Sequence, residues 1–239
     1  MYLLYSTLLA LTLLLSMPYW AFQMLRHGKY HKGLSERFGK VPSRIVSQPF
    51  RPAIWIHAVS VGEVLAISGV VELLRSNFPH YRIVVSTTTD TSQCLARQRF
   101  GEANVFYFPL DFGFAILPYL RLLRPVLVVI AETEFWPNFL RLAHESGARI
   151  AIVNARISDR SLPGYRLFSR VFKRILNQVD LFLTQTSEDV RRLHAIGAPG
   201  DRVHKSGNLK FEVSLPPPNP IVGSLRSALQ QAGAGPVFV

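Results

Sequence analysis

From residue 53 onward the sequence alternates short apolar runs with segments of helical periodicity, and this alternation constrains the fold more than any other feature. The apolar runs are Ala53–Ile56, Arg82–Ser86, Val105–Phe108, Val126–Ile130, Ile150–Val153 and Leu181–Leu183. The helical segments are Val64–Asn77, Ser92–Phe100, Phe114–Leu123, Phe135–Glu145, Tyr165–Leu176 and Ser187–Ala195. Runs that are apolar on both faces are typical of parallel strands covered by helices on two sides. The pattern therefore predicts an α/β fold with a Rossmann-like, doubly wound parallel sheet over residues 53–215.

The N-terminal segment, residues 2–25, carries no charged side chain. At about 1.5 Å per residue it is long enough to cross a hydrocarbon core of roughly 30 Å. A cleaved signal peptide would have a Lys or Arg before the apolar stretch and small residues after it, but here the bulky Met17–Trp20 occupies that place. Residues 1–25 are therefore predicted to be an uncleaved membrane anchor. Pro18 and several Ser and Thr side chains leave open a helix that lies in the membrane surface instead.

Residues 26–52 form a basic segment after the anchor, and the whole chain has a formal net charge of +12. Cationic flanks stay on the cytoplasmic side, which places everything after the anchor there. The segment is either only a determinant of topology or a contact with an anionic membrane surface and substrate phosphates. No nucleic-acid partner is expected, because the basic residues do not form one stripe interleaved with aromatic side chains. Cys94 has no partner for an internal disulfide and is expected to be a structural thiol in a helix.

Polar side chains gather where the expected strands end. The clusters are His57–Glu63, Thr87–Asp90, Pro109–Asp111, Glu132–Asn138 and Asn154–Ser158. Open α/β sheets bind ligands at the carboxyl ends of their strands, so these clusters predict a ligand site. Any one of them is also a plausible helix cap. A nicotinamide dehydrogenase is excluded, because the first strand–helix turn lacks the G-x-G-x-x-G pattern.

Four motifs in this order resemble the 3-deoxy-D-manno-oct-2-ulosonic acid (Kdo) transferases. They are Ser60-Val-Gly-Glu63, Glu132-Thr-Glu-Phe-Trp-Pro-Asn138, Asn154-Ala-Arg-Ile-Ser158 followed by Arg160, Ser161 and Tyr165, and Gly207-Asn-Leu-Lys-Phe211. The resemblance implies the N-terminal, acceptor domain of a GT-B glycosyltransferase at the inner membrane. It also implies CMP-Kdo as the donor, a lipid A precursor such as lipid IVA as the acceptor, and no cofactor or metal. The sequence departs from the family pattern at Ser92, where glycine is usual, and at Glu212, where aspartate is usual.

The resemblance assigns roles to three residues. Glu63 matches the general base of the family, and its place at a helix start is expected to favour the ionised form that accepts a proton. Glu132 and Lys210 match positions that stabilise the transition state. The expected substrate contacts are Ser60, Gly62, Thr88, Glu134, Asn138, Asn154, Arg156 and Arg160.

Each assignment has a plainer alternative. Glu63 is also suited to be an N-terminal helix partner, and Glu132 a helix cap. Arg156, Arg160 and Lys210 are also compatible with a solvated surface. The run Arg166, Arg170, Lys173 and Arg174 falls at helical spacing and is expected to be an outer face.

The last residues, 216–239, are expected to be a linker and the start of a truncated donor domain. Pro216–Pro220 is typical of a stiff linker, Val222–Gln231 has helical periodicity, and Pro236–Val239 is compatible with an opening strand. The chain then corresponds to the acceptor half of a longer enzyme. The alternative is a membrane-tethered acceptor-binding module without catalytic activity.

Overall fold

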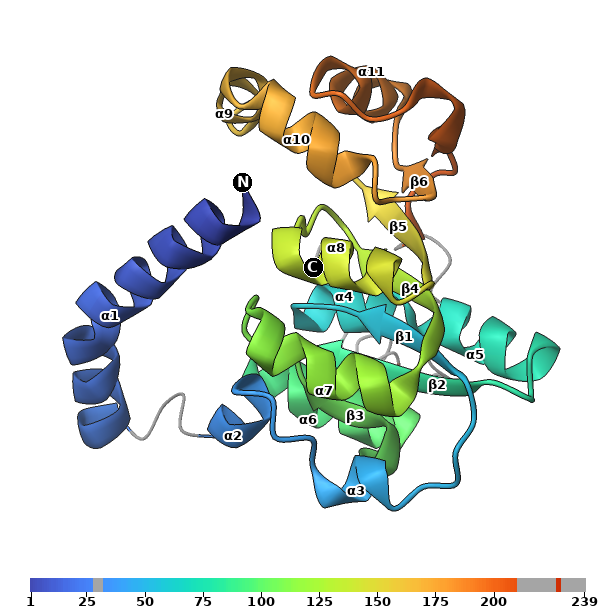
Figure 1. The fold of residues 1–239 in the computed structure, drawn as a ribbon. Coiled ribbons are helices and arrows are strands. Elements are labelled where there is room, and N and C mark those ends of the chain that lie inside the picture. The colour runs from blue at the N-terminus through green and yellow to red at the C-terminus, as the bar shows by residue number, and fades with distance from the viewer. Residues whose placement is uncertain (28–31, 210–226, 229–239) are drawn as a thin grey trace.

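A seven-stranded parallel sheet forms the centre of the protein in a computed structural model that describes residues 1–27, 32–209 and 227–228 (Figure 1). The strands are β1 (Ala53–His57), β2 (Arg82–Thr87), β3 (Val105–Tyr107), β4 (Pro125–Ala131), β5 (Arg149–Ala155), β6 (Leu181–Thr184) and β7 (Val203–Lys205). Their order is β3-β2-β1-β4-β5-β6-β7, and every pairing is parallel. The predicted class, a Rossmann-like doubly wound α/β domain after an apolar helix, is confirmed. Strand β7 is an addition to the six strands that the sequence pattern predicts.

Both faces of the central strands are buried, as their continuous apolar runs require. In β1, Trp55 pairs with Val84 of β2 and Val128 of β4, and all five residues of the strand are buried. Successive side chains point to opposite faces of a strand. Trp55 therefore packs in one hydrophobic cluster, and Ile54 and Ile56 pack in the other. The sheet separates two cores, and helices must cover both.

The helices are α1 (Tyr2–His27), α2 (Leu34–Arg37), α3 (Ser43–Val46), α4 (Val61–Ala66), α5 (Ser68–Asn77), α6 (Asp90–Phe100), α7 (Gly113–Leu123), α8 (Pro137–Glu145), α9 (Leu162–Leu167), α10 (Ser169–Leu176) and α11 (Ser187–Ala195). Two short 3₁₀ turns are Glu102–Asn104 and Gly200–Arg202. Helices α4, α5 and α6 cover the face of Ile54 and Ile56. Helices α7, α8, α10 and α11 cover the face of Trp55. This is the two-sided cover that the sequence predicts.

Two helices that the periodicity predicts as continuous are each interrupted. Val64–Asn77 is divided at Ile67, between α4 and α5, where the Ser68 hydroxyl donates to the Val64 carbonyl and Gly69 follows. Both features weaken a continuous helix. Tyr165–Leu176 is divided at Phe168, which has φ −105° and ψ 25°. Cys94 lies in α6, as expected, and its side chain is exposed.

The segment that follows α1 packs onto the sheet edge. The Glu36 carboxylate accepts hydrogen bonds from the Tyr107 backbone N–H at 2.9 Å and from Arg44 at 2.6 Å. The Tyr119 hydroxyl donates to the Glu36 carbonyl. Residues 34–46 therefore belong structurally to the α/β domain, although they lie in the basic segment that follows the anchor. Within the described residues, one helix segment, Tyr2–Met24, is long and apolar enough to cross a membrane.

Candidate functional site

The strand order reverses between β1 and β4, and the region beyond the carboxyl ends of these two strands, hereafter the crevice, is where a doubly wound sheet is expected to bind its ligand. From these two neighbouring strands the chain departs in opposite directions, to β2 on one side and to β5 on the other. Such a reversal opens a ligand crevice beyond the carboxyl ends of the strands. Glu63 lies in the first turn of α4 after β1, and Glu132 and Glu134 follow β4. The fold thus brings the first two predicted motifs to the same crevice.

Glu63 is held in one orientation by the loop that precedes it. Its carboxylate accepts a hydrogen bond from the Val59 backbone N–H at 2.8 Å and one from the Ser60 hydroxyl at 2.7 Å. Ser60 is the N-cap of α4, and its side chain accepts from the Glu63 N–H. The Glu63 carboxylate therefore does support the start of α4, as the plainer interpretation predicts. This arrangement fixes the side chain without consuming all the acceptor sites of the two oxygens.

The net effect of this environment on Glu63 is opposite to the sequence-based expectation. Burial raises the pKa of Glu63 above its ordinary value, and the charge of Glu132 raises it further. The hydrogen bonds from Val59 and Ser60 lower the pKa but do not cancel the burial. The helix position does stabilise the ionised form, yet desolvation of a side chain in a residue only 7% exposed dominates. A raised pKa makes Glu63 a stronger proton acceptor once it is ionised.

Three carboxylates influence one another at this crevice. Burial raises the pKa of Glu134 to about 7, with further contributions from the charges of Glu63 and Glu132. One cation lies beside them, since the Arg156 Nε is 3.6 Å from a Glu132 carboxylate oxygen. The Arg156 side chain is 60% exposed and so remains open to a further anion. Among residues 1–27, 32–209 and 227–228 these groups do not form a metal-ligand cluster.

Backbone strain coincides with the crevice. Glu132 and Asn154, at the ends of β4 and β5, have φ values of 59° and 58°, in the left-handed region that costs energy for residues with a Cβ. The Asn154 side-chain oxygen accepts a hydrogen bond from the Leu209 backbone N–H at 3.2 Å. This contact brings the start of the fourth motif to the end of β5. Lys210 itself, Phe211, Glu212 and the expected linker, helix and strand of 216–239 lie outside the described residues, apart from 227–228.

Buried polar atoms without a hydrogen-bond partner also concentrate at this edge. Within the described part of the chain there are seven such side-chain atoms. Five of them come from residues at or after the carboxyl ends of strands: His57 Nε2, Thr88 Oγ1, Gln93 Nε2, Trp136 Nε1 and Asn154 Nδ2. A buried polar group without a partner is costly, and unpaired groups at a strand-end crevice are typical of a site whose partner is a ligand or ordered water.

The first turn of α6 supports the Glu63 loop, a contact that the sequence does not predict. The Ser92 hydroxyl donates to the Val59 carbonyl at 2.9 Å, so the residue that departs from the family pattern holds the same loop that orients Glu63. Arg37 stacks on the Tyr107 ring at 4.7 Å and donates to the Thr88 carbonyl. The spacing Thr89-x-x-Ser92 is a capping-box signal that identifies the start of α6 from sequence, but not the contact with Val59.

Asn138 does not face an open site, and its expected substrate contact is corrected here. It is 2% exposed, and its amide donates to the Asp111 carbonyl at 2.6 Å and to the Ser6 hydroxyl at 2.9 Å. The Asp111 carboxylate accepts from the backbone N–H groups of Asn138 and Phe139 and so caps α8. Glu132, whose alternative role was this cap, does not perform it.

The remaining expected contacts lie around the crevice with different exposure. Ser60 and Gly62 are half-buried at the start of α4, whereas Arg160 is exposed. The run Arg166, Arg170, Lys173 and Arg174 lies on α9 and α10, away from the core, which confirms the expected outer face.

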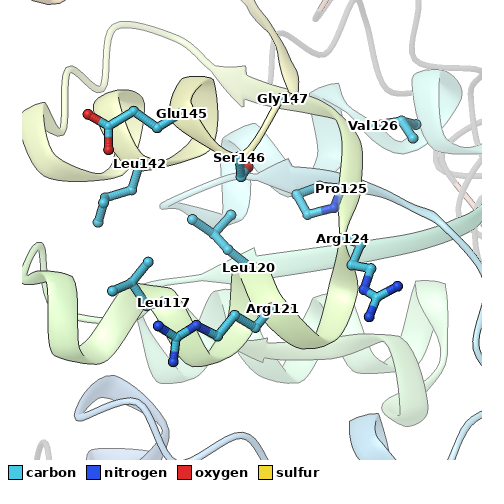
Figure 2. Close-up of a pocket in the computed structure, with 10 residues that line it drawn as sticks. All are labelled: Leu117, Leu120, Arg121, Arg124, Pro125, Val126, Leu142, Glu145, Ser146 and Gly147. Carbon is cyan, nitrogen blue, oxygen red and sulfur yellow. The ribbon is translucent and has the colours of Figure 1, made fainter.

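A large groove lies at the opposite edge of the sheet. Figure 2 shows its lining side chains, which come from the C-terminal ends of α7 and α8 and the start of β4. It is open to solvent and has a volume of about 810 Å³. Arg121, Arg124 and Glu145 are exposed at its rim, and Leu117 and Leu142 line its wall. It contains none of the predicted site residues.

Comparisons with known proteins agree with the four motifs. The family model described as 3-deoxy-D-manno-octulosonic-acid transferase (Kdo transferase) matches residues 32–213. A protein of Chlamydia pneumoniae with the name 3-deoxy-D-manno-octulosonic acid transferase is 33% identical over 212 residues, which cover 88% of this chain and 48% of that protein. A protein of the same name from Haemophilus influenzae is 29% identical over 211 residues, covering 88% and 49%.

The solved structures support the fold alone. A putative UDP-N-acetylglucosamine 2-epimerase from Listeria monocytogenes matches with a TM-score of 0.51 and 13% sequence identity, over 74% of this chain and 51% of that one. The chain spans about half the length of the curated relatives it matches. The family model nevertheless covers most of its α/β domain, including the crevice between β1 and β4. The chain therefore belongs to the Kdo transferase family of glycosyltransferases.

Proposed function

We propose that this chain is the acceptor-binding part of an enzyme that transfers Kdo from CMP-Kdo to a lipid A precursor such as lipid IVA at the cytoplasmic face of the inner membrane. The observation that carries the proposal is the meeting of Glu63 and Glu132 in one crevice at the switch point of the sheet. In the proposed domain division, residues 1–25 attach the protein to the membrane, 26–52 follow as a basic segment, 53–215 hold the acceptor, and 216–239 lead into a donor-binding domain.

Glu63 is the proposed general base. Transfer requires that an acceptor hydroxyl lose its proton while it attacks the anomeric carbon of Kdo and the bond to the CMP phosphate breaks. The proton passes to the Glu63 carboxylate, and the electron pair of the broken bond leaves with CMP. The hydrogen bonds from Val59 and Ser60 hold the carboxylate in one orientation, so little reorganisation is needed when the hydroxyl arrives.

Glu132 acts mainly by positioning the guanidinium of Arg156. A carboxylate cannot stabilise the negative charge that develops on the leaving phosphate, but an arginine beside it can. Arg156 lies 3.6 Å from Glu132 and is largely exposed, so Glu132 orients a guanidinium toward incoming anions. Lys210 is assigned to the same task by the family motif. Ser60, Gly62, Thr88, Glu134, Asn154 and Arg160 are the proposed contacts to the acceptor.

The test is transfer of labelled Kdo from CMP-Kdo to lipid IVA by a preparation that contains the complete enzyme. Glu63→Gln is expected to lower kcat by about 10²–10⁴-fold, the usual contribution of a general base, with lipid IVA binding unchanged. The matched control is Glu72→Gln, a change of the same kind at an exposed carboxylate on α5. Near-normal turnover of Glu63→Gln would remove the assignment. Binding of lipid IVA without any transfer by the wild-type protein would favour the tethered binding module.

A further inference from the structure

The first turns of α1 contact the α/β domain through polar groups. The Asn138 amide donates to the Ser6 hydroxyl at 2.9 Å, and Tyr5 is hydrogen-bonded to the Asp111 carboxylate. The Arg141 guanidinium lies over the Tyr2 ring, 4.8 Å from its centre. We call these contacts the polar clasp; its members are Tyr2, Tyr5 and Ser6 on α1 and Asp111, Asn138 and Arg141 in the domain. The clasp joins the beginning of the apolar helix, and not only its end, to the domain.

Helix α1 has two different faces along its length. The half-buried positions recur every three or four residues, as one face of a helix does: Tyr2, Tyr5, Ser6, Leu9, Leu13, Ser16, Trp20, Gln23 and Met24. The exposed positions on the other side are rich in large apolar residues: Leu3, Leu4, Leu8, Leu11, Leu15 and Phe22. An exposed stripe of this kind is unfavourable in water and requires a cover. Tyr2, Tyr5 and Ser6 face the protein. Most of the leucines face away from it, although Leu9 and Leu13 lie on the half-buried face.

The polar clasp is incompatible with a helix that crosses the bilayer. The 26 residues of α1 extend about 39 Å at 1.5 Å per residue. If α1 crossed a hydrocarbon core of about 30 Å, Tyr2 would lie on the far side of the membrane from the domain that follows the helix. Asn138 and Arg141 belong to that domain, so they could not contact Ser6 and Tyr2.

We propose that α1 lies in the plane of the membrane surface, docked on α8 by the polar clasp, with its leucine face inserted at the headgroup boundary of an anionic bilayer. The neighbouring surface has the same character. Tyr2 also hydrogen-bonds Gln178, just after α10, and Figure 1 shows the N-terminal end of α1 on the side of α8, α9 and α10. There Leu167 and Phe168 are exposed among the cations of α9 and α10. Apolar side chains mixed with Lys and Arg are typical of helices that lie on anionic lipid.

The docking connects the membrane to the candidate site. Asp111 bonds Tyr5 of α1 and at the same time caps α8, the helix that follows the loop bearing Glu132 and Glu134. A helix held in the membrane surface therefore sets the height of this loop above the lipid. This last step rests on the proposed function, because it matters only if the acceptor is a membrane lipid, whereas the docking itself does not.

Thiol crosslinking in the full chain tests the docking. The protein carries Cys94→Ser, Tyr2→Cys and Arg141→Cys and is reconstituted on the outside of vesicles of phosphatidylethanolamine with a minority of phosphatidylglycerol. A short bismaleimide is expected to join the thiols introduced at positions 2 and 141, detected as a linked peptide by mass spectrometry. In the matched control, Leu14→Cys replaces Tyr2→Cys; it lies about 18 Å further along the helix and is expected to give a several-fold lower yield.

Two further measurements make the result decisive. A membrane-impermeant maleimide added outside the vesicles is expected to label the protein whose single thiol is the one introduced by Tyr2→Cys. Tyr5→Phe with Ser6→Ala, which alters only α1, is expected to lower the crosslink yield several-fold. Protection of the thiol at position 2 from the external reagent, with no crosslink, would show that α1 spans the bilayer and overturn the proposal. Labelling of that thiol from outside without a crosslink would overturn the polar clasp. Neither result bears on the base assigned to Glu63.

Discussion

The two ends of the parallel strands, the amino edge and the carboxyl edge of the sheet, differ in shape and in the chemistry of their side chains. The groove at the amino edge is large, but its charged rim groups are exposed, and one of them, Glu145, is paired with Arg141 of the same helix. The crevice at the carboxyl edge is identified by buried polar atoms without partners, by Glu134 with a pKa raised to about 7, and by strained backbone at Glu132 and Asn154. The groove at the amino edge contains none of the predicted site residues. Buried polar atoms without hydrogen-bond partners and carboxylates with raised pKa values cost stability. Their presence at one end of the strands therefore favours a binding site there over a mere surface depression.

The two ends of α8 give the largest expected contrast in stability. Asp111 caps the N-terminal end through the Asn138 and Phe139 N–H groups at 3.1 and 2.7 Å. Asp111→Ala leaves these buried donors unpaired and is expected to lower the free energy of unfolding by about 2–3 kcal/mol. Glu145→Ala, at the exposed C-terminal end, is expected to cost less than about 0.5 kcal/mol. Urea denaturation of both variants measures the difference, and equal losses would contradict the assigned cap.

The sheet was predictable because its strands are apolar on both faces, a pattern that few other structures require. Ala53–Ile56 became β1 with one added residue, His57, and the gathering of polar strand ends followed from the rule for parallel sheets. β7, with only three residues, has no pattern of its own. The interruption at Ile67 coincides with the hydrogen bond from the Ser68 hydroxyl to the Val64 carbonyl and with Gly69, and apolar periodicity reveals neither effect.

Within the site, the sequence identified the loops but not the direction of each side chain. Asn138 belongs to a family motif, yet its amide is turned toward Asp111 and Ser6, which are 27 and 132 residues distant in sequence. The direction predicted for the pKa shift of Glu63 was wrong. The shift depends mainly on burial, which the fold creates, whereas the sequence shows only the position of Glu63 at a helix start. In the sequence, Ser92 stands out only because it departs from the family pattern. Its hydrogen bond to the Val59 carbonyl can be seen only in the folded structure.

The pH dependence of stability provides a second contrast between the edges. The folded pKa of Glu134, about 7, lies above the ordinary value of 4.5 that applies to the unfolded chain. The folded state therefore binds more protons between these values, and the stability that Glu134 contributes is fully present below about pH 4.5 and lost as the pH rises through about 7. Glu134→Gln is expected to be more stable than the wild type at pH 8 by about 1 kcal/mol, after allowance for the partial exposure of the side chain.

Urea denaturation of Glu134→Gln at pH 5 and pH 8 gives this difference directly. The control is Glu145→Gln at the amino edge, the same change at an exposed carboxylate that is paired with Arg141. If Glu134→Gln retained the wild-type dependence between these pH values, the pKa of Glu134 would not be raised by burial and the neighbouring carboxylates as described.

The smallest expected effect separates two kinds of backbone strain. Arg124, at the amino edge, has φ 42° because it ends α7 in the left-handed conformation where glycine is the usual residue. Its guanidinium lies over the Phe50 ring at 5.2 Å, a contact that offsets part of the strain. Arg124→Gly relieves the strain and loses this contact, so unfolding is expected to require about 0.5 kcal/mol more free energy, with transfer unchanged.

Asn154→Gly relieves a similar strain at the carboxyl edge but removes the side chain that accepts from Leu209. It is expected to lower transfer even where thermal denaturation shows no loss of stability. Full activity in Asn154→Gly would mean that the strain at both edges serves only to turn the chain.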